Sequence, residues 1–465
     1  MDSAGAGDVL MNENETKTSA LLVTTTLSSF LTPLMASGVN IALPSIGNEF
    51  RLDAVLLSWV STSFALTGAV FLVPFGRVAD IYGRKIIFQC GMVIFTLSAL
   101  LLPFSTSVTS LILLRLSQGF GSSMAYSTAV AILTSAFPPG ERGKVMGINV
   151  AAVYSGLSLG PFIGGFLTQH FGWRSIFIFS LPFCLVVLYY AFWKLKGEWA
   201  EAKGEKFDLT GSAIYSIALI AMMYGFTLLP TPLGVWLILI GSLGILAFIK
   251  WELKVKSPVL DLNLFRDRIF AFSNLAALIH YSATFSVAFL LSLYLQYTKG
   301  LGPQSAGLIL VSQPVVMALF SPFAGRVSDR IEPRIVASIG MGFVMIGVFF
   351  FVFLEEKTAL PYIIANLILL GFGFAFFSSP NANSVMGSVE KKSLGVASGI
   401  LSTMRQTGQM FSMGIVTVIF SIYIGRVQIT PEYYPLFLKS LKIVFLLSAG
   451  LCMGAIFASL SRGKR

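Results

Sequence analysis

Residues 76–85 read G-R-V-A-D-I-Y-G-R-K, and residues 325–334 read G-R-V-S-D-R-I-E-P-R. Each segment follows an apolar stretch of about 20 residues, the length that crosses the hydrocarbon of a bilayer. A charged loop that recurs after two such stretches indicates a membrane protein built from two related halves.

The composition supports a lipid environment. The chain has 465 residues, of which 55% are hydrophobic and only 11% charged, and its mean hydropathy is +0.81. A soluble protein of this length needs more charge to cover its surface. The formal net charge of +11 is explained by basic residues that fix membrane topology, so we expect no nucleic-acid partner.

Apolar stretches separated by charged or Pro/Gly-rich breaks predict fourteen membrane spans, and therefore an all-α polytopic protein. The predicted spans are 20–43, 54–76, 86–104, 109–132, 143–167, 173–193, 209–229, 234–251, 269–297, 304–324, 335–354, 360–380, 394–422 and 437–460. With both termini in the cytoplasm, most of the 32 lysines and arginines fall in cytoplasmic loops and tails. This bias predicts a multi-pass protein of the cell membrane with that orientation.

The two related loops follow spans 2 and 10, eight spans apart, whereas two six-helix halves would place them six apart. The simplest explanation is that spans 7 and 8 are inserted between the halves. The predicted organisation is a tail at 1–19, a six-helix half at 20–193, a linker at 194–208, two inserted helices at 209–253, a second linker at 254–268, a six-helix half at 269–460 and a tail at 461–465.

Several motifs resemble those of a known family. G-R-V-A-D-I-Y-G-R-K is similar to the signature loop of the major facilitator superfamily, L-L-R-L-S-Q-G-F-G at 113–121 resembles its span-4 motif, and G-L-S-L-G-P-F-I-G-G at 156–165 resembles its span-5 antiporter motif. G-W-R-S-I-F at 172–177 and G-V-A-S-G-I-L-S-T-M-R-Q-T-G at 395–408 are similar to the EmrB/QacA-like drug:proton antiporter branch.

The resemblance implies a major facilitator fold and a secondary active transporter. It implies proton-coupled efflux of an amphipathic small molecule, a drug-like compound or a metabolite, by alternating access. The expected partners are that small molecule, protons and the lipid bilayer, with no cofactor and no bound metal. We also expect that the chain is not an enzyme.

The repeated loops predict a gate. Gly76 and Gly83 permit close packing and a tight turn, and an ion-pair latch of Asp80 with Arg77 and Arg84 can form and break as the halves rock. The corresponding residues of the second loop are Gly325, Arg326, Asp329 and Arg330. The alternative is that these charges only anchor the topology.

The antiporter motif places small residues at intervals of four on one face of span 5. They are Gly156, Gly160, Gly164 and Gly165, with Pro161 among them. Such spacing lets a neighbouring helix approach closely, and Pro161 introduces a kink. The resemblance implies a seal between the halves that discourages leak, and plain helix packing is the alternative.

Three residues inside the spans are candidates for coupling. A charge at the depth of Arg115 or Arg405 is expensive and faces a cavity or a partner. The resemblance ties Arg115 to proton coupling; a structural hydrogen bond is the alternative for both arginines. His280 is about 16 Å deep in span 9, so it is a candidate proton carrier, or else a neutral histidine inside the bundle.

One position departs from the resemblance. Members of the branch usually carry an acidic residue in span 1, at the position where this chain, aligned on Asn40 and Pro44, has Met35. No carboxylate sits near mid-membrane; Glu252, at the end of span 8, comes closest. Two arginines without acids predict a neutral to positive cavity. We therefore expect a neutral or anionic amphipathic substrate.

The resemblance also places a substrate path between the halves. Its polar and aromatic candidates are Asn40, Gln118, Tyr126, Asn274, Tyr294, Gln296, Gln313, Asn381 and Asn383, each with a helix–helix hydrogen bond as the alternative. A second possible function is an importer or facilitator of a small metabolite without proton coupling. A receptor or an enzyme is disfavoured, because the sequence has no phosphate-binding loop and only two histidines.

Overall fold

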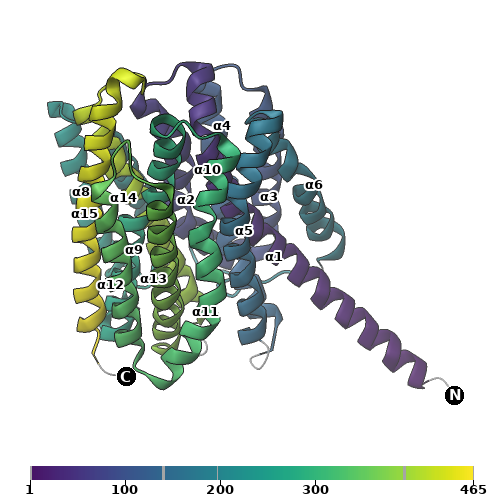
Figure 1. Ribbon diagram of the computed structural model, residues 1–465. Helices are drawn as coiled ribbons and strands as arrows, with labels where there is room; N and C mark the ends of the chain where they lie inside the picture. The colour runs from purple at the N-terminus through teal and green to yellow at the C-terminus, as the bar shows by residue number, and fades with distance from the viewer. Residues whose placement is uncertain (1–2, 139–141, 196, 391–393, 464–465) are drawn as a thin grey trace.

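The computed structural model describes the chain except residues 1–2, 139–141, 196, 391–393 and 464–465. The described residues form a bundle of long α-helices (Figure 1). The first six are α1 (Ser3–Phe50), α2 (Ala54–Tyr82), α3 (Arg84–Leu101), α4 (Val108–Ala136), α5 (Arg142–Phe171) and α6 (Ser175–Tyr189). A hairpin of α7 (Leu209–Leu228) and α8 (Pro232–Glu252) follows. The last seven are α9 (Arg268–Leu293), α10 (Pro303–Leu310), α11 (Ser312–Arg330), α12 (Pro333–Phe350), α13 (Leu360–Gly387), α14 (Leu394–Tyr423) and α15 (Tyr434–Ser461).

Among the described residues, 12 helical segments are long and apolar enough to cross a membrane. They correspond to all of the predicted spans except two, α4 and α14. These two helices have 29 and 30 residues, long enough to span, but they are less apolar and carry Arg115 and Arg405. The two predicted spans that are not apolar enough to be counted are thus the two that hold the predicted intramembrane arginines.

The predicted span at 304–324 is divided in the structure. α10 ends at Leu310 and α11 begins at Ser312, with Val311 between them. Pro314 lacks the N–H that would bond to the carbonyl of Leu310, which explains a break at this point. The two pieces together form one candidate span, from Pro303 to Ser328.

Each half packs mainly within itself. In the N-terminal half α1 packs on α5, and α4 packs on α2 and α3. In the C-terminal half α13 packs on α11 and α12, and α9 packs on α14 and α15. The halves meet where α2 contacts α14 and where α5 contacts α10. We call the end of the bundle that holds residues 76–85 the loop end, and the opposite end, at residues 51–53, the far end.

The inserted hairpin lies against the junction of the halves, because α7 contacts both α2 and α14. Tyr215 on α7 donates a hydrogen bond to the carbonyl of Ala69 on α2, at 3.1 Å. On the other side, Ser421 at the end of α14 donates to the carbonyl of Leu229, at 2.6 Å. No role was predicted for these helices from the sequence; in the structure α7 bridges the two halves.

Candidate substrate cavity

A cavity of about 550 Å³ opens between the two halves at the loop end. α2 and α4 line it from the N-terminal half, and α14 lines it from the C-terminal half. Residues 258–261 and Glu201 contribute from the two linkers. Tyr126 on α4, and Ser402 and Thr403 on α14, are the lining residues that lie deepest along these two helices. The cavity therefore reaches from the linkers toward the middle of the bundle.

Toward the far end, the halves are held together by polar contacts. Ser292 on α9 donates a hydrogen bond to the carbonyl of Asn40 on α1, at 2.8 Å. Gln296 Nε2 donates to the carbonyl of Ile41, at 2.9 Å. Two predicted substrate-path residues, Asn40 and Gln296, therefore join the halves in this structure.

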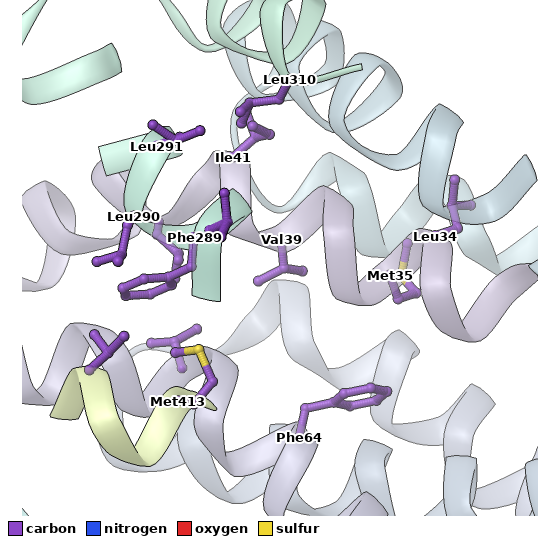
Figure 2. Packing of buried hydrophobic residues seen from close by; sticks show 14 of the residues in the cluster. Leu34, Met35, Val39, Ile41, Phe64, Phe289, Leu290, Leu291, Leu310 and Met413 are labelled. Atoms are coloured by element: carbon purple, nitrogen blue, oxygen red, sulfur yellow. The ribbon is translucent and has the colours of Figure 1, made fainter. Parts of the chain in front are cut away.

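Apolar packing accompanies these bonds. Figure 2 shows Val39 and Ile41 of α1 beside Phe289 and Leu290 of α9, with Met413 of α14 close by. All of these side chains are buried. Contacts of this kind exclude water, so the two halves are closed toward the far end while the cavity is open at the loop end.

The antiporter-motif glycines bring α5 against its neighbours. A Cβ at Gly156 would lie 2.3 Å from the carbonyl of Phe30, and one at Gly164 would lie 2.8 Å from the Cα of Gly38. Gly160 likewise packs against α1, and a Cβ at Gly165 would lie 2.5 Å from the carbonyl of Pro303. The motif therefore permits α5 to pack tightly on α1 and, at Gly165, on the other half of the molecule.

The loop at 76–85 holds a network of charges. Arg84 Nη2 lies 2.6 Å from Asp80 Oδ1, and Arg84 Nη1 lies 2.9 Å from Glu201 Oε1. Arg77 pairs with Glu205 at 2.5 Å. The predicted pair of Asp80 with Arg84 is present, whereas Arg77 turns to the linker instead of to Asp80. The linker carboxylates are partners that the sequence analysis did not identify.

The linker also binds backbone groups of the loop. Glu198 Oε1 accepts the N–H of Lys85 at 2.7 Å, and its Oε2 accepts the N–H of Ile86 at 3.3 Å. A carboxylate at the first N–H groups of α3 is favoured by the helix dipole. Ser257 and then Arg77 hold the pKa of Glu205 below its ordinary value, so this group is ionised at neutral pH.

The two predicted glycines of this loop differ. Gly83 has φ +124°, a conformation that other residues rarely adopt, as the predicted turn requires. Gly76 has ordinary space around it, since a Cβ there would lie 3.9 Å from Ser127. The close packing expected at Gly76 is therefore wrong, because α2 and α4 are separated by normal side-chain contact at this point.

In the second loop the structure describes part of the predicted latch. Arg326 and Arg330 are exposed, and the side chain of Asp329 lies outside the described residues. A Cβ at Gly325 would lie 3.2 Å from Ser379 Oγ, so α11 and α13 pack closely here.

Arg115 is almost completely buried, at 1% exposed, between α4 and α2. Its Nε donates to the carbonyl of Val60 at 3.2 Å, and its Nη1 donates to Gln118 Oε1 at 2.7 Å. The guanidinium also lies over the ring of Phe64, 4.6 Å from its centroid. Arg115 thus makes structural hydrogen bonds, the alternative given for it above, and Gln118 is one of its acceptors.

His280 is fully buried among aromatic side chains of the C-terminal half. Its ring centroid lies 4.2 Å from that of Phe377 and 4.6 Å from that of Phe374. Nδ1 is 3.0 Å from Met341 Sδ, and in the described part of the chain Nε2 has no hydrogen-bond partner. The structure therefore places this candidate proton carrier within one half, away from the lining of the cavity.

Arg405 lies in a different environment. It is half-buried, near the phenol groups of Tyr126, Tyr154 and Tyr281. Its guanidinium carbon is 5.8 Å from the centroid of the Tyr281 ring. Across the residues that the structure describes, no carboxylate pairs with Arg405, and its buried Nε has no hydrogen-bond partner. Arg405 and Tyr126 were predicted from the sequence as candidate site residues, whereas Tyr154 and Tyr281 were not.

Most of the other predicted path residues make hydrogen bonds within or between helices. Asn274 donates to the Phe270 carbonyl and Tyr294 to the Glu355 carbonyl. Asn381 donates to the Ser273 carbonyl and Asn383 to Ser328 Oγ, and the four distances are 2.6–3.2 Å. Gln313 is half-buried where α11 packs on Gly371. Of the predicted path residues, Tyr126 lines the cavity.

The span-1 position that departs from the motif is buried. Met35 is 1% exposed and belongs to the same apolar cluster as Leu34 and Val39, its neighbours on α1 in Figure 2. Glu252 is also buried, and its Oε2 accepts the N–H of Leu260 at 2.9 Å. This carboxylate therefore lies at the loop end, where it holds the linker that contributes to the cavity.

A helical bundle with a cavity between two related halves defines the class of a multi-pass membrane transporter. The sequence profile of the Major Facilitator Superfamily matches residues 25–251 and 274–464, and the chain belongs to this family. The predicted superfamily is thereby confirmed. The solved structures agree on the fold: NupG, a nucleoside transporter, aligns with TM-score 0.64 and 13% identity over 96% of this chain and 99% of that one. A bacterial homologue of the lysosomal transporter Spinster, in an inward-facing and unoccupied conformation, aligns with TM-score 0.62 and 16% identity over 96% and 97%.

Curated relatives are similar along most of the chain. The riboflavin transporter RibZ of Clostridioides difficile is 30% identical over 87% of this chain and 88% of its own. The multidrug resistance protein Stp of Mycobacterium tuberculosis is 29% identical, over 87% and 76%. The cephamycin export protein CmcT of Amycolatopsis lactamdurans is 28% identical, over 88% and 86%. The family thus transports chemically different small molecules.

Proposed function

We propose that this chain is a fourteen-span exporter of the drug:proton antiporter branch. It exchanges a neutral or anionic amphipathic small molecule for protons by alternating access, in the cell membrane and with both termini in the cytoplasm. The observation that carries the proposal is the 550 Å³ cavity, which is open between the halves at one end while the halves are joined toward the other.

The loop end faces the cytoplasm in this proposal, because most of the basic residues lie there. The structure is then the state that receives substrate from the cytoplasm. An exporter must next open the far end, which requires breaking the contacts of Asn40 and Gln296 with the opposite half and closing the cavity. The charged loop at 76–85 borders that cavity, so its ion pairs are placed to change during closure.

The motif glycines of α5 support a seal. Gly165 lies against Pro303 of the other half, and a Cβ at Gly307 would lie 2.2 Å from the carbonyl of Pro161. Helices whose backbones leave no room for even a Cβ between them also leave no space for water or ions. In the proposed cycle these contacts keep the far end closed while the cavity is open to the cytoplasm.

The substrate charge follows from the groups available. Arg405 is a cation without a carboxylate partner among the described residues, and Met35 stands where the branch has an acid. A permanently cationic substrate would meet an unfavourable charge here, whereas a neutral or anionic one would not. The apolar and aromatic walls suit an amphipathic molecule.

The test uses purified protein in liposomes with an imposed pH gradient. The probes are 1-naphthalenesulfonate, 1-naphthalenesulfonamide and tetraphenylphosphonium, which are anionic, neutral and cationic. Exchange with protons predicts saturable accumulation of the sulfonate or the sulfonamide in vesicles that are acidic inside. Nigericin should abolish that accumulation, and liposomes without protein should not show it. Saturable accumulation of tetraphenylphosphonium alone would overturn the proposed substrate class.

An importer or facilitator without proton coupling is the second candidate. It is favoured by the position of His280 away from the cavity and by the lack of an acid at mid-depth, which leaves no obvious proton carrier. The similarity to a protein named as a riboflavin transporter is compatible with it. The liposome assay separates the two functions, since a facilitator equilibrates the probe without concentrating it, whichever way the gradient runs.

A further inference from the structure

We propose that Arg405, together with Tyr126, Tyr154 and Tyr281, forms a binding site for the acidic group of an anionic substrate. The site rests on the proposed transport function and specifies its ligand: a compound with one oxyanion, such as a sulfonate or a carboxylate, on an aromatic or apolar body. The phenol groups and the guanidinium supply the donors, and the tyrosine rings supply the walls.

The four residues come from both halves and lie at a common depth. Tyr126 on α4 and Tyr154 on α5 belong to the N-terminal half, and Tyr281 on α9 and Arg405 on α14 belong to the C-terminal half. At about 1.5 Å per residue, each lies roughly 15–20 Å along its helix from the loop end. A site shared by both halves at the middle of the bundle is where alternating access can expose a ligand to either side.

The charge of Arg405 is the reason for expecting an anion. An arginine at this depth is costly unless it faces a partner or a water-filled cavity. Arg115, the other intramembrane arginine, is satisfied by Val60 and Gln118 within the N-terminal half. Arg405 has no such bonds in the described structure, and its side chain is half-buried rather than enclosed. A planar guanidinium in this setting is suited to bind an oxyanion through two hydrogen bonds.

The cavity gives the ligand a route to the site. Tyr126 and Ser402 line the cavity, and Ser402 lies one turn before Arg405 on the same face of α14. The side chain of Tyr126 lies near Ser402, so the two residues border the inner part of the cavity from opposite halves. Rotation of the Tyr126 side chain would join the cavity to the space around Arg405.

The tyrosines determine which anions fit. The Tyr281 ring lies 5.8 Å from the guanidinium carbon, near enough for a cation–π contact that orients Arg405. The hydroxyl of Tyr154 is near Ser378 of α13, which places its ring between the halves. Aromatic rings on several sides favour a flat, apolar body attached to the anion, and they disfavour small inorganic anions, which would lose hydration without gaining such contacts.

The test compares matched ligands on the purified full-length chain in detergent. 1-Naphthalenesulfonate and pyrene-1-sulfonate are each titrated against the corresponding sulfonamide, which keeps the ring and removes the charge. Isothermal titration calorimetry with the unmodified protein should show tighter binding of each sulfonate. Arg405→Gln should weaken sulfonate binding at least tenfold and leave sulfonamide binding within twofold.

Two further variants sharpen the result. Arg405→Lys keeps the charge without the planar fork, so it should retain an intermediate affinity for the sulfonates. Arg426→Gln removes one positive charge from an exposed position at the far end and should change neither affinity. Thermal unfolding of each variant reports whether the fold is intact, and Tyr281→Phe provides a conservative change should Arg405→Gln fail to fold.

The possible outcomes separate the two proposals. Equal sulfonate affinity in Arg405→Gln and the unmodified protein overturns the anion site. Binding of the sulfonamides without binding of the sulfonates also overturns the anion site. That outcome is still compatible with transport of neutral amphipathic molecules. Failure of both ligand types to bind, together with accumulation of tetraphenylphosphonium alone in the liposome assay, overturns the proposed substrate class itself.

Discussion

Arg84 Nη1 lies 2.9 Å from Glu201 Oε1, so the linker between the N-terminal half and the inserted hairpin is tied to the loop that borders the cavity. The side chain of Glu201 is 63% exposed, whereas the side chain of Arg84 is only 6% exposed. Because Glu201 is open to solvent, which screens the interaction, the pair contributes about 0.2–1 kcal/mol. Its effect on stability is therefore small, whereas its position allows it to bias the equilibrium between the two states of the transporter.

We expect Glu201→Gln to change the transport rate about two- to five-fold while the unfolding temperature stays nearly constant. A bias of about 0.4–1 kcal/mol between states corresponds to that factor. Initial rates in proteoliposomes and thermal unfolding in detergent measure the two effects. Glu432→Gln, at an exposed far-end position, is the matched control. A rate equal to that of the control would show that the linker carboxylate has no part in gating.

Asp80→Asn should have a larger effect on stability. Asp80 accepts a hydrogen bond from Arg84 Nε at 2.8 Å and neutralises a guanidinium that is almost completely buried. Removing the negative charge of Asp80 leaves the buried guanidinium of Arg84 with less opposite charge beside it. We therefore expect the unfolding free energy to fall by about 1–3 kcal/mol. The pair Asp80→Asn and Glu201→Gln, measured singly and together by thermal unfolding, gives the coupling through Arg84. Strict additivity would show that the two carboxylates do not share that partner.

Gly164→Ala should disrupt the contact between α5 and α1. The added Cβ would lie 2.6–3.0 Å from backbone atoms of Gly38, where neither helix has a flexible side chain to move aside. Overpacking at such a contact destabilises by about 1–3 kcal/mol. Gly147→Ala is the control on the same helix, since nothing lies within 4 Å of its Cβ and alanine favours the helix. Equal unfolding temperatures for the two variants would contradict the tight packing of the motif.

The sequence predicted the bundle well because membrane spans depend on local apolarity. It predicted the loop at 76–85, the turn at Gly83 and the glycine contacts of α5, all of which follow from residue types at short spacing. It did not predict the partners of the loop, because Glu198, Glu201 and Glu205 are more than a hundred residues away along the chain. Nor did it predict α7 as a bridge, since an apolar helix can face lipid or protein equally well.

The site was harder to predict for the same reason. Arg405 stood out as a charge within a span, but the tyrosines around it come from α4, α5 and α9, and a tyrosine in a span is compatible with many positions. Tyr154 and Tyr281 carry one signal that sequence reasoning missed: each is a polar aromatic residue near the middle of its helix. Which mid-span residues face the same space is decided by helix rotation, which the apolar pattern of a membrane helix does not record.

His280→Leu should leave the pH dependence of transport intact. The ring of His280 is enclosed by Phe374, Phe377 and Met341, so a proton would have to enter an apolar site that gives the charged form no partner. Leucine fills similar space and is expected to cost less than about 2 kcal/mol of stability. Transport rates of the variant and the unmodified protein are compared between pH 5.5 and 8. Loss of the pH dependence in a stable variant would instead show that His280 is the proton carrier, as its depth in predicted span 9 suggested.

Variants of Arg115 can distinguish a structural role of this residue from a role in proton coupling. Because its Nε and Nη1 bond to the Val60 carbonyl and to Gln118, Arg115→Gln should remove both bonds, leave Gln118 Oε1 without this donor and lower the unfolding free energy by about 1–3 kcal/mol. Arg115→Lys keeps the charge but cannot reach both acceptors with a planar fork, so it should recover only part of that stability. The decisive measurement is the number of protons exchanged per substrate in folded Arg115→Lys. An unchanged ratio with reduced stability assigns Arg115 to the packing of α4 on α2, whereas a changed ratio in a protein of full stability assigns it to coupling.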